Sequence, residues 1–187
     1  MRRLILILGC ALVLVQCTIA LGDDSTAPKS HLQPVNANWS LNPDGTFHVT
    51  LTGHPSIQLN LDREYKIYLL VFDDGSLAGK DIHGLVFVPE DHQSSVSFTI
   101  GKDAHPRNEA DLERTYKGTT VTMEKGNVDG MGVQRLRWTA PPHLCSSFTV
   151  TVSDTSGTLY PLAVTLIANT PERLAALEKG FSDIQFH

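Results

Sequence analysis

Cysteine is scarce in this 187-residue chain, and that scarcity limits which bonds can hold the fold together. Two of the three cysteines, Cys10 and Cys17, lie in an N-terminal hydrophobic run that we expect to be removed. Cys145 is then the one cysteine left, so no disulfide can form within the mature chain. Three states stay open for it: a buried apolar side chain, a disulfide to a second copy that makes a homodimer, or a reactive thiol.

Blocks of positive charge are also missing. The chain has 15 Lys and Arg against 20 Asp and Glu, a formal net charge of -5. Loss of Arg2 and Arg3 with the N-terminal segment would leave 13 basic residues against the same 20 acidic ones, a net charge of -7. Nucleic acids and anionic membrane surfaces both require clustered positive charge, so the sequence argues against either as a partner.

Well-known catalytic motifs are a third absence. The sequence contains no G-x-S-x-G, no H-E-x-x-H, no glycine-rich phosphate loop and no C-x-x-C. We therefore favour a binding module over an enzyme and predict no cofactor.

The N-terminal segment has the features of a secretory signal peptide. Arg2 and Arg3 precede the apolar run LILILGCALVLV, and Ala20 and Gly22 provide small residues at the expected cleavage site. A signal anchor is the alternative, but the run is shorter than the ~20 apolar residues of a membrane span. We predict a signal peptide over 1–22, a secreted, extracellular protein, and no membrane span in the mature chain.

The remaining chain has the length of one domain. Removing 22 of the 187 residues leaves 165. Residues 23–34 are polar and without periodicity, and we predict a flexible leader there. A β-sandwich domain is predicted over 35–169, and a C-terminal helix and tail over 170–187.

Alternation of apolar and polar residues is the main pattern of the domain. Stretches such as YKIYLLVF, GLVFV and SSVSFTI are typical of strands, and the turn sequence Asn42-Pro43-Asp44-Gly45 predicts a hairpin over 35–51. The strands are separated by connections that contain Gly, Asp or Pro. The sequence predicts an all-β fold, an antiparallel immunoglobulin-like β-sandwich of about nine strands.

Two segments have helix signals instead. Asn108 can cap a short helix from Glu109 to about Tyr116. Thr170 can cap a second helix, with Pro171 at its first position and Gly180 at its exit.

Histidines supply the main argument for a metal site. The chain has eight, none at the close spacing that places two on one face of a strand or helix. A metal site would need residues distant in the sequence to converge, and the candidates are His83, His92, His105 and His143. Scattered surface histidines are the alternative. Separately, Asn38-Trp39-Ser40 is an N-glycosylation sequon, which predicts that Asn38 is exposed.

The segment 134–152, QRLRWTAPPHLCSSFTVTV, combines Trp, His and Cys. Alternation places Leu136 and Trp138 on the inward face of one strand, and the proline pair at 141–142 ends that strand. Phe148, Val150 and Val152 then restart the inward face on the next strand. Cys145 is predicted to lie in the connection.

These strands are similar to those of the reeler domain, an extracellular β-sandwich. YKIYLLVF with IHGLVFVPED, and QRLRWTAPP with SSFTVTVSD, resemble consecutive strands of that family, including its W-x-A-P ending, over roughly 65–168. The family's several cysteines and its Thr-His pair are missing here. The resemblance implies adhesion to, or recognition of, matrix or microbial surfaces, with no catalytic residues to transfer. An immunoglobulin-like sandwich outside this family is the competing interpretation.

Two functions follow as hypotheses. The first is a secreted, non-enzymatic binding or adhesion module for an extracellular protein, matrix or glycan ligand, including microbial surfaces. The alternative is a histidine-based metal-binding or metal-dependent secreted protein.

Overall fold

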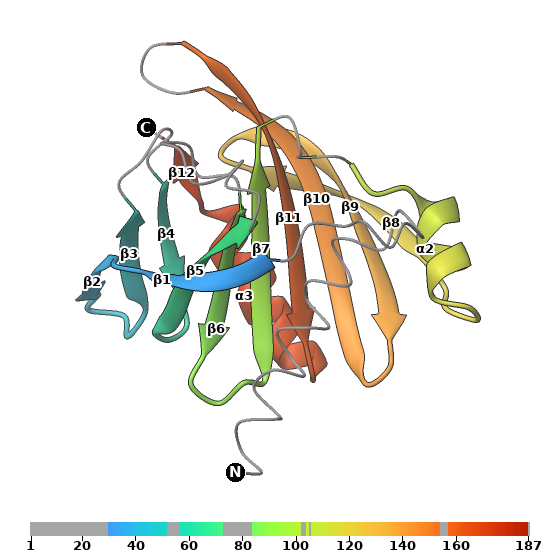
Figure 1. The fold of residues 1–187 in the computed structure, drawn as a ribbon, viewed down its shortest axis with the longest axis horizontal. Helices are drawn as coiled ribbons and strands as arrows, with labels where there is room; N and C mark the ends of the chain where they lie inside the picture. Colours follow the sequence, from blue (N-terminus) through green and yellow to red (C-terminus); the bar gives the residue numbers. More distant parts are fainter. Residues whose placement is uncertain are drawn as a thin grey trace.

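The computed structural model describes residues 30–51, 57–72, 84–101, 104, 106–153 and 157–186. The predicted signal peptide and residues 23–29 of the predicted leader lie outside this part. The described chain is mostly β, with two antiparallel sheets and two helices, one of them C-terminal (Figure 1). Within it, no helix combines the length and the apolar character that crossing a membrane requires.

The larger sheet has eight antiparallel strands. In spatial order they are β1 (Ser30–Val35), β5 (Tyr65–Phe72), β6 (Gly84–Pro89), β7 (Ser94–Ile100), β11 (Leu159–Ala168), β10 (His143–Ser153), β9 (Met131–Ala140) and β8 (Thr122–Val128). The chain therefore crosses from β7 to β8 at the far edge and returns by hairpins to place β11 beside β7.

The smaller sheet lies at the left in Figure 1, away from β8 at the right-hand edge. Its order is β12 (Gln185–Phe186), β4 (Ile57–Leu61), β3 (Phe47–Leu51) and β2 (Asn38–Leu41). The β2–β3 hairpin confirms the hairpin predicted from the Asn-Pro-Asp-Gly turn, where Gly45 adopts a φ of +83°.

Three of the strands were not predicted. β4 has the alternating sequence IQLNL, and its burial alternates accordingly, but the sequence interpretation left it out. β12 has two residues and is too short to give a periodic signal. β1 begins at Ser30, so ordered structure starts before Val35, within the range predicted as a leader. Pro34 is compatible with β1 because this strand forms an edge of the sheet.

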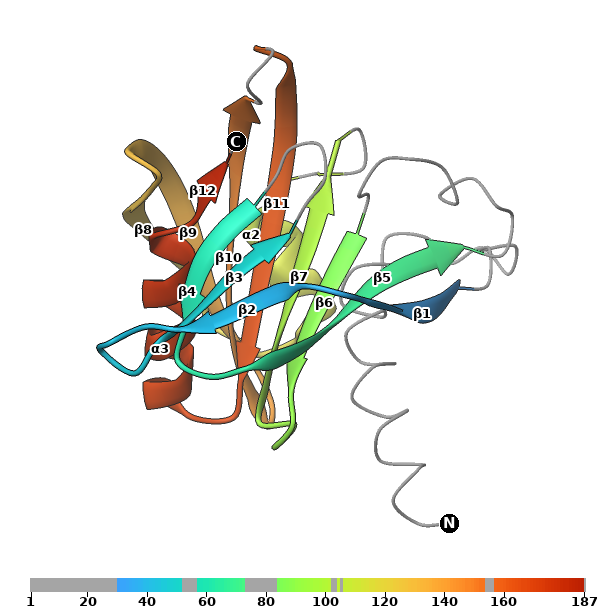
Figure 2. The same ribbon diagram turned by 90° about the vertical axis from the view of Figure 1, so that its left-hand side faces the viewer.

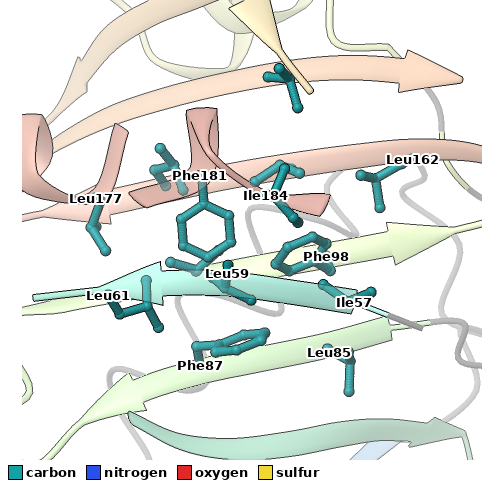
Figure 3. Close-up of a cluster of buried hydrophobic side chains, with 14 of the residues drawn as sticks. Ile57, Leu59, Leu61, Leu85, Phe87, Phe98, Leu162, Leu177, Phe181 and Ile184 are labelled. Atoms are coloured by element: carbon teal, nitrogen blue, oxygen red, sulfur yellow. The ribbon is translucent and has the colours of Figure 1, made fainter. Parts of the chain in front are cut away.

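One face of the large sheet, which we call the inner face, packs against the small sheet and helix α3 (Pro171–Ser182) (Figure 2). Phe87 of β6, Phe98 of β7 and Phe181 of α3 form its aromatic centre, with ring centroids 5.2 to 6.1 Å apart (Figure 3). Leu59 of β4 lies over them, so four elements contribute to the centre of this core.

Helix α3 begins as predicted: Thr170 is its N-cap, its hydroxyl accepts from the backbone N–H of Arg173, and Pro171 opens the helix. The prediction that Gly180 marks the exit was wrong, because the helix continues to Ser182. Gly180 serves close packing instead. A Cβ at this position would lie 2.6 Å from the backbone oxygen of Asn60, so only glycine lets α3 approach β4 this closely.

Polar contacts complete the docking of α3. The guanidinium of Arg137 donates to both carboxylate oxygens of Glu178, at 2.7 and 2.5 Å, and also to Glu124 at 2.8 Å. Burial alone would raise the pKa of Glu178, but hydrogen bonds and positive charge from Arg137 outweigh it, and the pKa lies below its ordinary value. Arg135, on the same face of β9, donates to Ser182.

The opposite, outer face carries a second apolar cluster. Helix α2 (Glu109–Thr115) confirms the predicted short helix, including its Asn108 cap, and its Leu112 packs into this cluster. The strand residues of this cluster are Val86, Leu136, Trp138, Cys145 and Ile167. Leu136 and Trp138 are therefore buried as predicted, but on the opposite face from Phe148, Val150 and Val152, which lie in the inner core.

Candidate functional site

A pocket of about 580 Å³ opens on the outer face, between the end of α2 and the β9–β10 hairpin. We call it the α2 pocket. Three groups of residues line it: the segment after α2, the hairpin, and two strand residues at its floor. They are Tyr116, Lys117, Gly118, Thr119, Thr120, Thr139, Ala140, Pro141, Pro142, His143, Cys145 and Ile167. Its volume lies within the range of about 300–1,000 Å³ that is usual for ligand pockets.

The first wall follows from how α2 begins and ends. Asn108 Oδ1 accepts from the backbone N–H of Asp111, and acidic residues in the first turn suit the helix dipole. Leu112 anchors the helix on the sheet. Tyr116 then follows as the C-cap, with its ring 6.2 Å from that of Trp138, so the helix delivers an aromatic side chain to the rim of the pocket.

A threonine pair fixes the next part of this wall. The Thr119 hydroxyl donates to the backbone oxygen of Thr139 at 2.8 Å and accepts from the backbone N–H of Thr139 at 3.1 Å. The Thr119 hydroxyl therefore makes the two hydrogen bonds to the Thr139 backbone that a neighbouring strand would otherwise make. The segment after α2 is thereby attached to the strand that forms the opposite wall.

The second wall is the β9–β10 hairpin. Pro141 and Pro142, joined by a cis peptide bond, form its turn, and His143 pairs with Ala140. The prediction that the proline pair ends the strand is confirmed, since β9 stops at Ala140. The ring of His143 lies with Nδ1 2.7 Å from Oδ1 of Asn169. A carbonyl oxygen only accepts, so Nδ1 is the donor and the ring is held in a fixed orientation.

Cys145 and Ile167 form the floor. Cys145 is 1% exposed and lies inside β10, paired with Trp138 on one side and Ile167 on the other. The prediction that Cys145 falls in a connection was wrong, because β10 begins directly after the proline pair. Trp138, beside the floor, is 3% exposed, and its Nε1 has no hydrogen-bond partner among the described residues.

The predicted metal ligands do not converge in the described part of the chain. His83 and His105 lie outside the described residues. His92 is exposed in the β6–β7 turn with a φ of +54°, and His143 faces the α2 pocket. Groups of three or more His, Cys, Asp or Glu that could bind a metal are not found where the structure describes the chain.

Asn38, the glycosylation candidate, is exposed at the start of β2. Because β2 is an edge strand of the small sheet, its outer side has no neighbouring strand in that sheet. The position suits the predicted modification, which stays a prediction.

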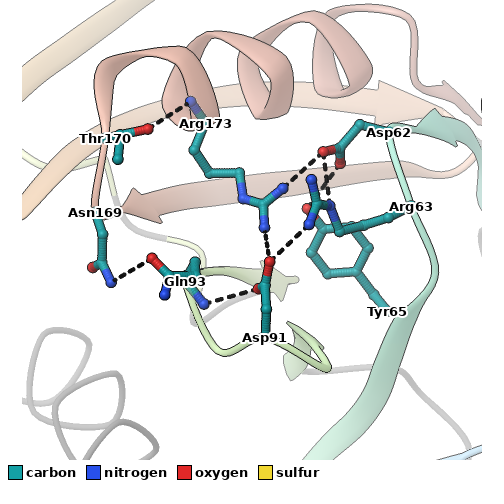
Figure 4. Close-up of polar contacts among 8 residues, drawn as sticks. All are labelled: Asp62, Arg63, Tyr65, Asp91, Gln93, Asn169, Thr170 and Arg173. Carbon is teal, nitrogen blue, oxygen red and sulfur yellow. Dashed lines mark hydrogen bonds and ion pairs between the residues drawn. The ribbon is translucent and has the colours of Figure 1, made fainter.

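A second hollow, of about 400 Å³, lies at the N-terminal end of α3, and sequence reasoning did not identify it. Glu172 lines it, and so do four charged residues that pair with one another, Asp62, Arg63, Asp91 and Arg173, which form what we call the Asp62–Arg173 cluster (Figure 4). Arg63 contacts Asp62 and Asp91 at 2.9 and 2.7 Å. Arg173 contacts Asp62 at 3.0 Å and also Asp91.

The Asp62–Arg173 cluster joins three parts of the fold. Asp62 and Arg63 follow β4, Asp91 lies in the β6–β7 turn, and Arg173 lies in the first turn of α3. Burial raises the pKa of the adjacent Tyr65, whose hydroxyl donates to Asp62, and the negative charge of Asp62 acts in the same direction. Two cations and two anions satisfy one another here, so we interpret the cluster as structural. No sequence signal brings these residues together, because they are separated by up to 111 positions.

Comparison of the sequence with models of protein families and with curated proteins finds no match. The reeler resemblance therefore has no support from these comparisons, and the arguments below depend on the α2 pocket.

Proposed function

We propose that this chain is a secreted, non-enzymatic binding module that recognises an extracellular ligand through the α2 pocket. The observation that carries the proposal is the pocket itself, formed by a capped helix, a threonine clamp and a proline turn on a mostly-β scaffold. Rigid walls favour recognition because little conformational freedom is lost on binding.

We further propose that the two sheets and α3 act as the layers of a sandwich-type module, and that the relationship to reeler domains holds. Both support a role in binding matrix or microbial surfaces. The W-x-A-P residues that carry the resemblance, from Trp138 to Pro141, end at the rim of the α2 pocket. The strand order differs from that of an immunoglobulin domain, which divides seven to nine strands between two comparable sheets.

The experiment compares binding of the secreted chain with that of a variant in which the pocket is filled. The probes are immobilised collagen, peptidoglycan and lipopolysaccharide. Ala140 is half-buried at the pocket wall, so A140F should reduce binding to whichever surface the unmodified chain binds. T120F fills the same space from an exposed position and tests the pocket even if A140F folds poorly.

A110F is the matched control, because Ala110 is exposed on α2 and does not line the pocket. It should bind like the unmodified chain. Binding that survives both pocket-filling substitutions would show that recognition occurs elsewhere. Failure to bind any of the three surfaces would overturn the proposed role.

A further inference from the structure

The charge of the α2 pocket is opposite to that of the chain. The protein has more acidic than basic residues, 20 against 15, yet the described lining residues include Lys117 and His143 and no Asp or Glu. A ligand with a positive head would therefore meet a lysine and no compensating carboxylate. The lining favours a neutral or negatively charged group.

Hydrogen-bond donors at the rim are available. The Lys117 ammonium forms no ion pair with the described residues. Thr120 and Thr139 are exposed at the rim, and their hydroxyls form no hydrogen bond with the described part of the chain. An ammonium and two hydroxyls in one rim suit an oxyanion, which accepts from each of them.

The floor has the opposite character. Cys145 and Ile167 are buried, and Pro141, Pro142 and Ala140 extend the apolar surface towards the hairpin. A ligand that matches both parts has an apolar body and an anionic head at one end. Burial of the body favours binding because it removes apolar surface from water.

We propose that the α2 pocket binds a small anionic amphiphile, whose apolar body lies over Cys145 and Ile167 and whose head lies at Lys117. This inference depends on the proposed function, since it names the ligand class of the same pocket. A free fatty acid and the anionic lipid portion of a larger surface ligand share this chemistry.

The test uses three probes built on an eight-carbon chain, which in octanoate includes the carboxyl carbon: octanoate, octan-1-ol and octyltrimethylammonium, each below the concentration at which it aggregates. Calorimetry gives the affinities. Fluorescence of Trp138 locates the site, because its ring lies 6.2 Å from that of Tyr116 in the pocket wall. The fluorescence is measured in a W39F background, which removes the second tryptophan and keeps the sequon.

We expect octanoate to bind about fivefold more tightly than octan-1-ol, as for one exposed charge pair, and octyltrimethylammonium to bind most weakly. K117E should remove the preference for octanoate. K125E makes the same charge change at an exposed residue of β8 that does not line the pocket, and should leave the preference unchanged. T120F should weaken octanoate and octan-1-ol alike.

The two proposals fail in different ways. If octan-1-ol or the cation binds as tightly as octanoate, or K117E leaves the preference intact, the anionic class is wrong, while binding that T120F abolishes still supports the pocket. If no amphiphile binds but A140F and T120F reduce binding to an immobilised surface, the amphiphile proposal alone is overturned. Octanoate binding that neither substitution affects would place the site elsewhere and overturn the inference. The second source is tested by displacement: a surface ligand with an anionic lipid portion should be released by octanoate.

Discussion

The inner face of the large sheet lies under a second sheet and a helix of 12 residues, whereas α2, which packs on the outer face, has seven. Among the described residues, the inner core has 25 buried apolar residues and the outer cluster has seven. The inner contacts include three aromatic rings and a glycine placed for close approach. On the outer face, the packing of α2 against the sheet does not fill the space beside the β9–β10 hairpin, and this space is the α2 pocket.

The difference suggests a division of roles within one sheet. A closely packed face stabilises the fold, and its side chains have no freedom to accept a ligand without loss of packing. The outer face has a smaller cluster, so a concave surface can exist there at a lower cost in stability. Substitutions on the two faces should therefore separate stability from binding.

Removal of the central aromatic ring should have the largest effect. Phe181 is fully buried between Phe87 and Phe98, and F181A should lower the free energy of unfolding by about 3–5 kcal/mol. Urea denaturation followed by circular dichroism measures this change. Removing an outer ring, Y116A, should cost clearly less, because Tyr116 is half-buried. Equal losses would contradict the distinction between the faces.

Adding a single methyl group at Gly180 should test how closely α3 must approach β4. G180A places a Cβ 2.6 Å from the Asn60 backbone oxygen, and the helix or the strand must move. We expect a loss of about 1–3 kcal/mol, although alanine favours helices more than glycine does. The control is K179A, at an exposed neighbouring position of the same helix, which should change stability little. A G180A variant as stable as the unmodified chain would show that the approach is not constrained.

The Arg137–Glu178 pair should make the inner face sensitive to acid. A carboxyl whose pKa is lowered by folding contributes stability above its unfolded pKa, and that contribution is lost as pH falls through the folded value. E178Q should cost about 1–2 kcal/mol at pH 7, less than a fully buried pair, because Arg137 keeps Glu124 and water as partners.

The same variant should also lose less stability than the unmodified chain between pH 6 and 3. E124Q is the matched control, since Glu124 is more exposed and its loss should cost under 1 kcal/mol. Denaturation curves at several pH values measure both effects. An E178Q variant that keeps the full acid sensitivity would assign that sensitivity to other carboxyls.

Local sequence signals predicted most helices and strands correctly. Sequence reasoning failed where the structure depends on contacts between residues far apart in the chain. The Asn108 and Thr170 caps and the Asn-Pro-Asp-Gly hairpin are read from neighbours in the chain, and the structure confirms them. Gly180 was misinterpreted because a helix-end signal and a close-packing glycine look the same in one sequence. The face of Trp138 was also wrong, since alternation gives two faces and does not say that both are covered.

The candidate site was predicted only in part. The segment 134–152 singled out Trp138, His143 and Cys145, which do lie together around the α2 pocket. The wall from α2 was missed, because no pattern in the sequence brings Tyr116 and Thr119 to β9. The Asp62–Arg173 cluster was missed for the same reason.

Cys145 should give the smallest effect on stability and the sharpest test of access to the outer face. C145A removes one small buried group and should cost about 1 kcal/mol or less. Because the Cys145 thiol is 1% exposed, it should react with iodoacetamide much more slowly in the native protein than in urea. Octanoate should slow the native reaction further, since Cys145 lines the pocket in which we propose that octanoate binds.

Burial of this thiol also argues against the homodimer through Cys145, because an intermolecular disulfide needs both sulfur atoms at the surface. Non-reducing electrophoresis of the secreted protein should show a monomer. A covalent dimer that C145A abolishes would show that β10 opens near the pocket. The outer face would then undergo a local opening that the inner face, held by α3 and its ion pairs, does not share.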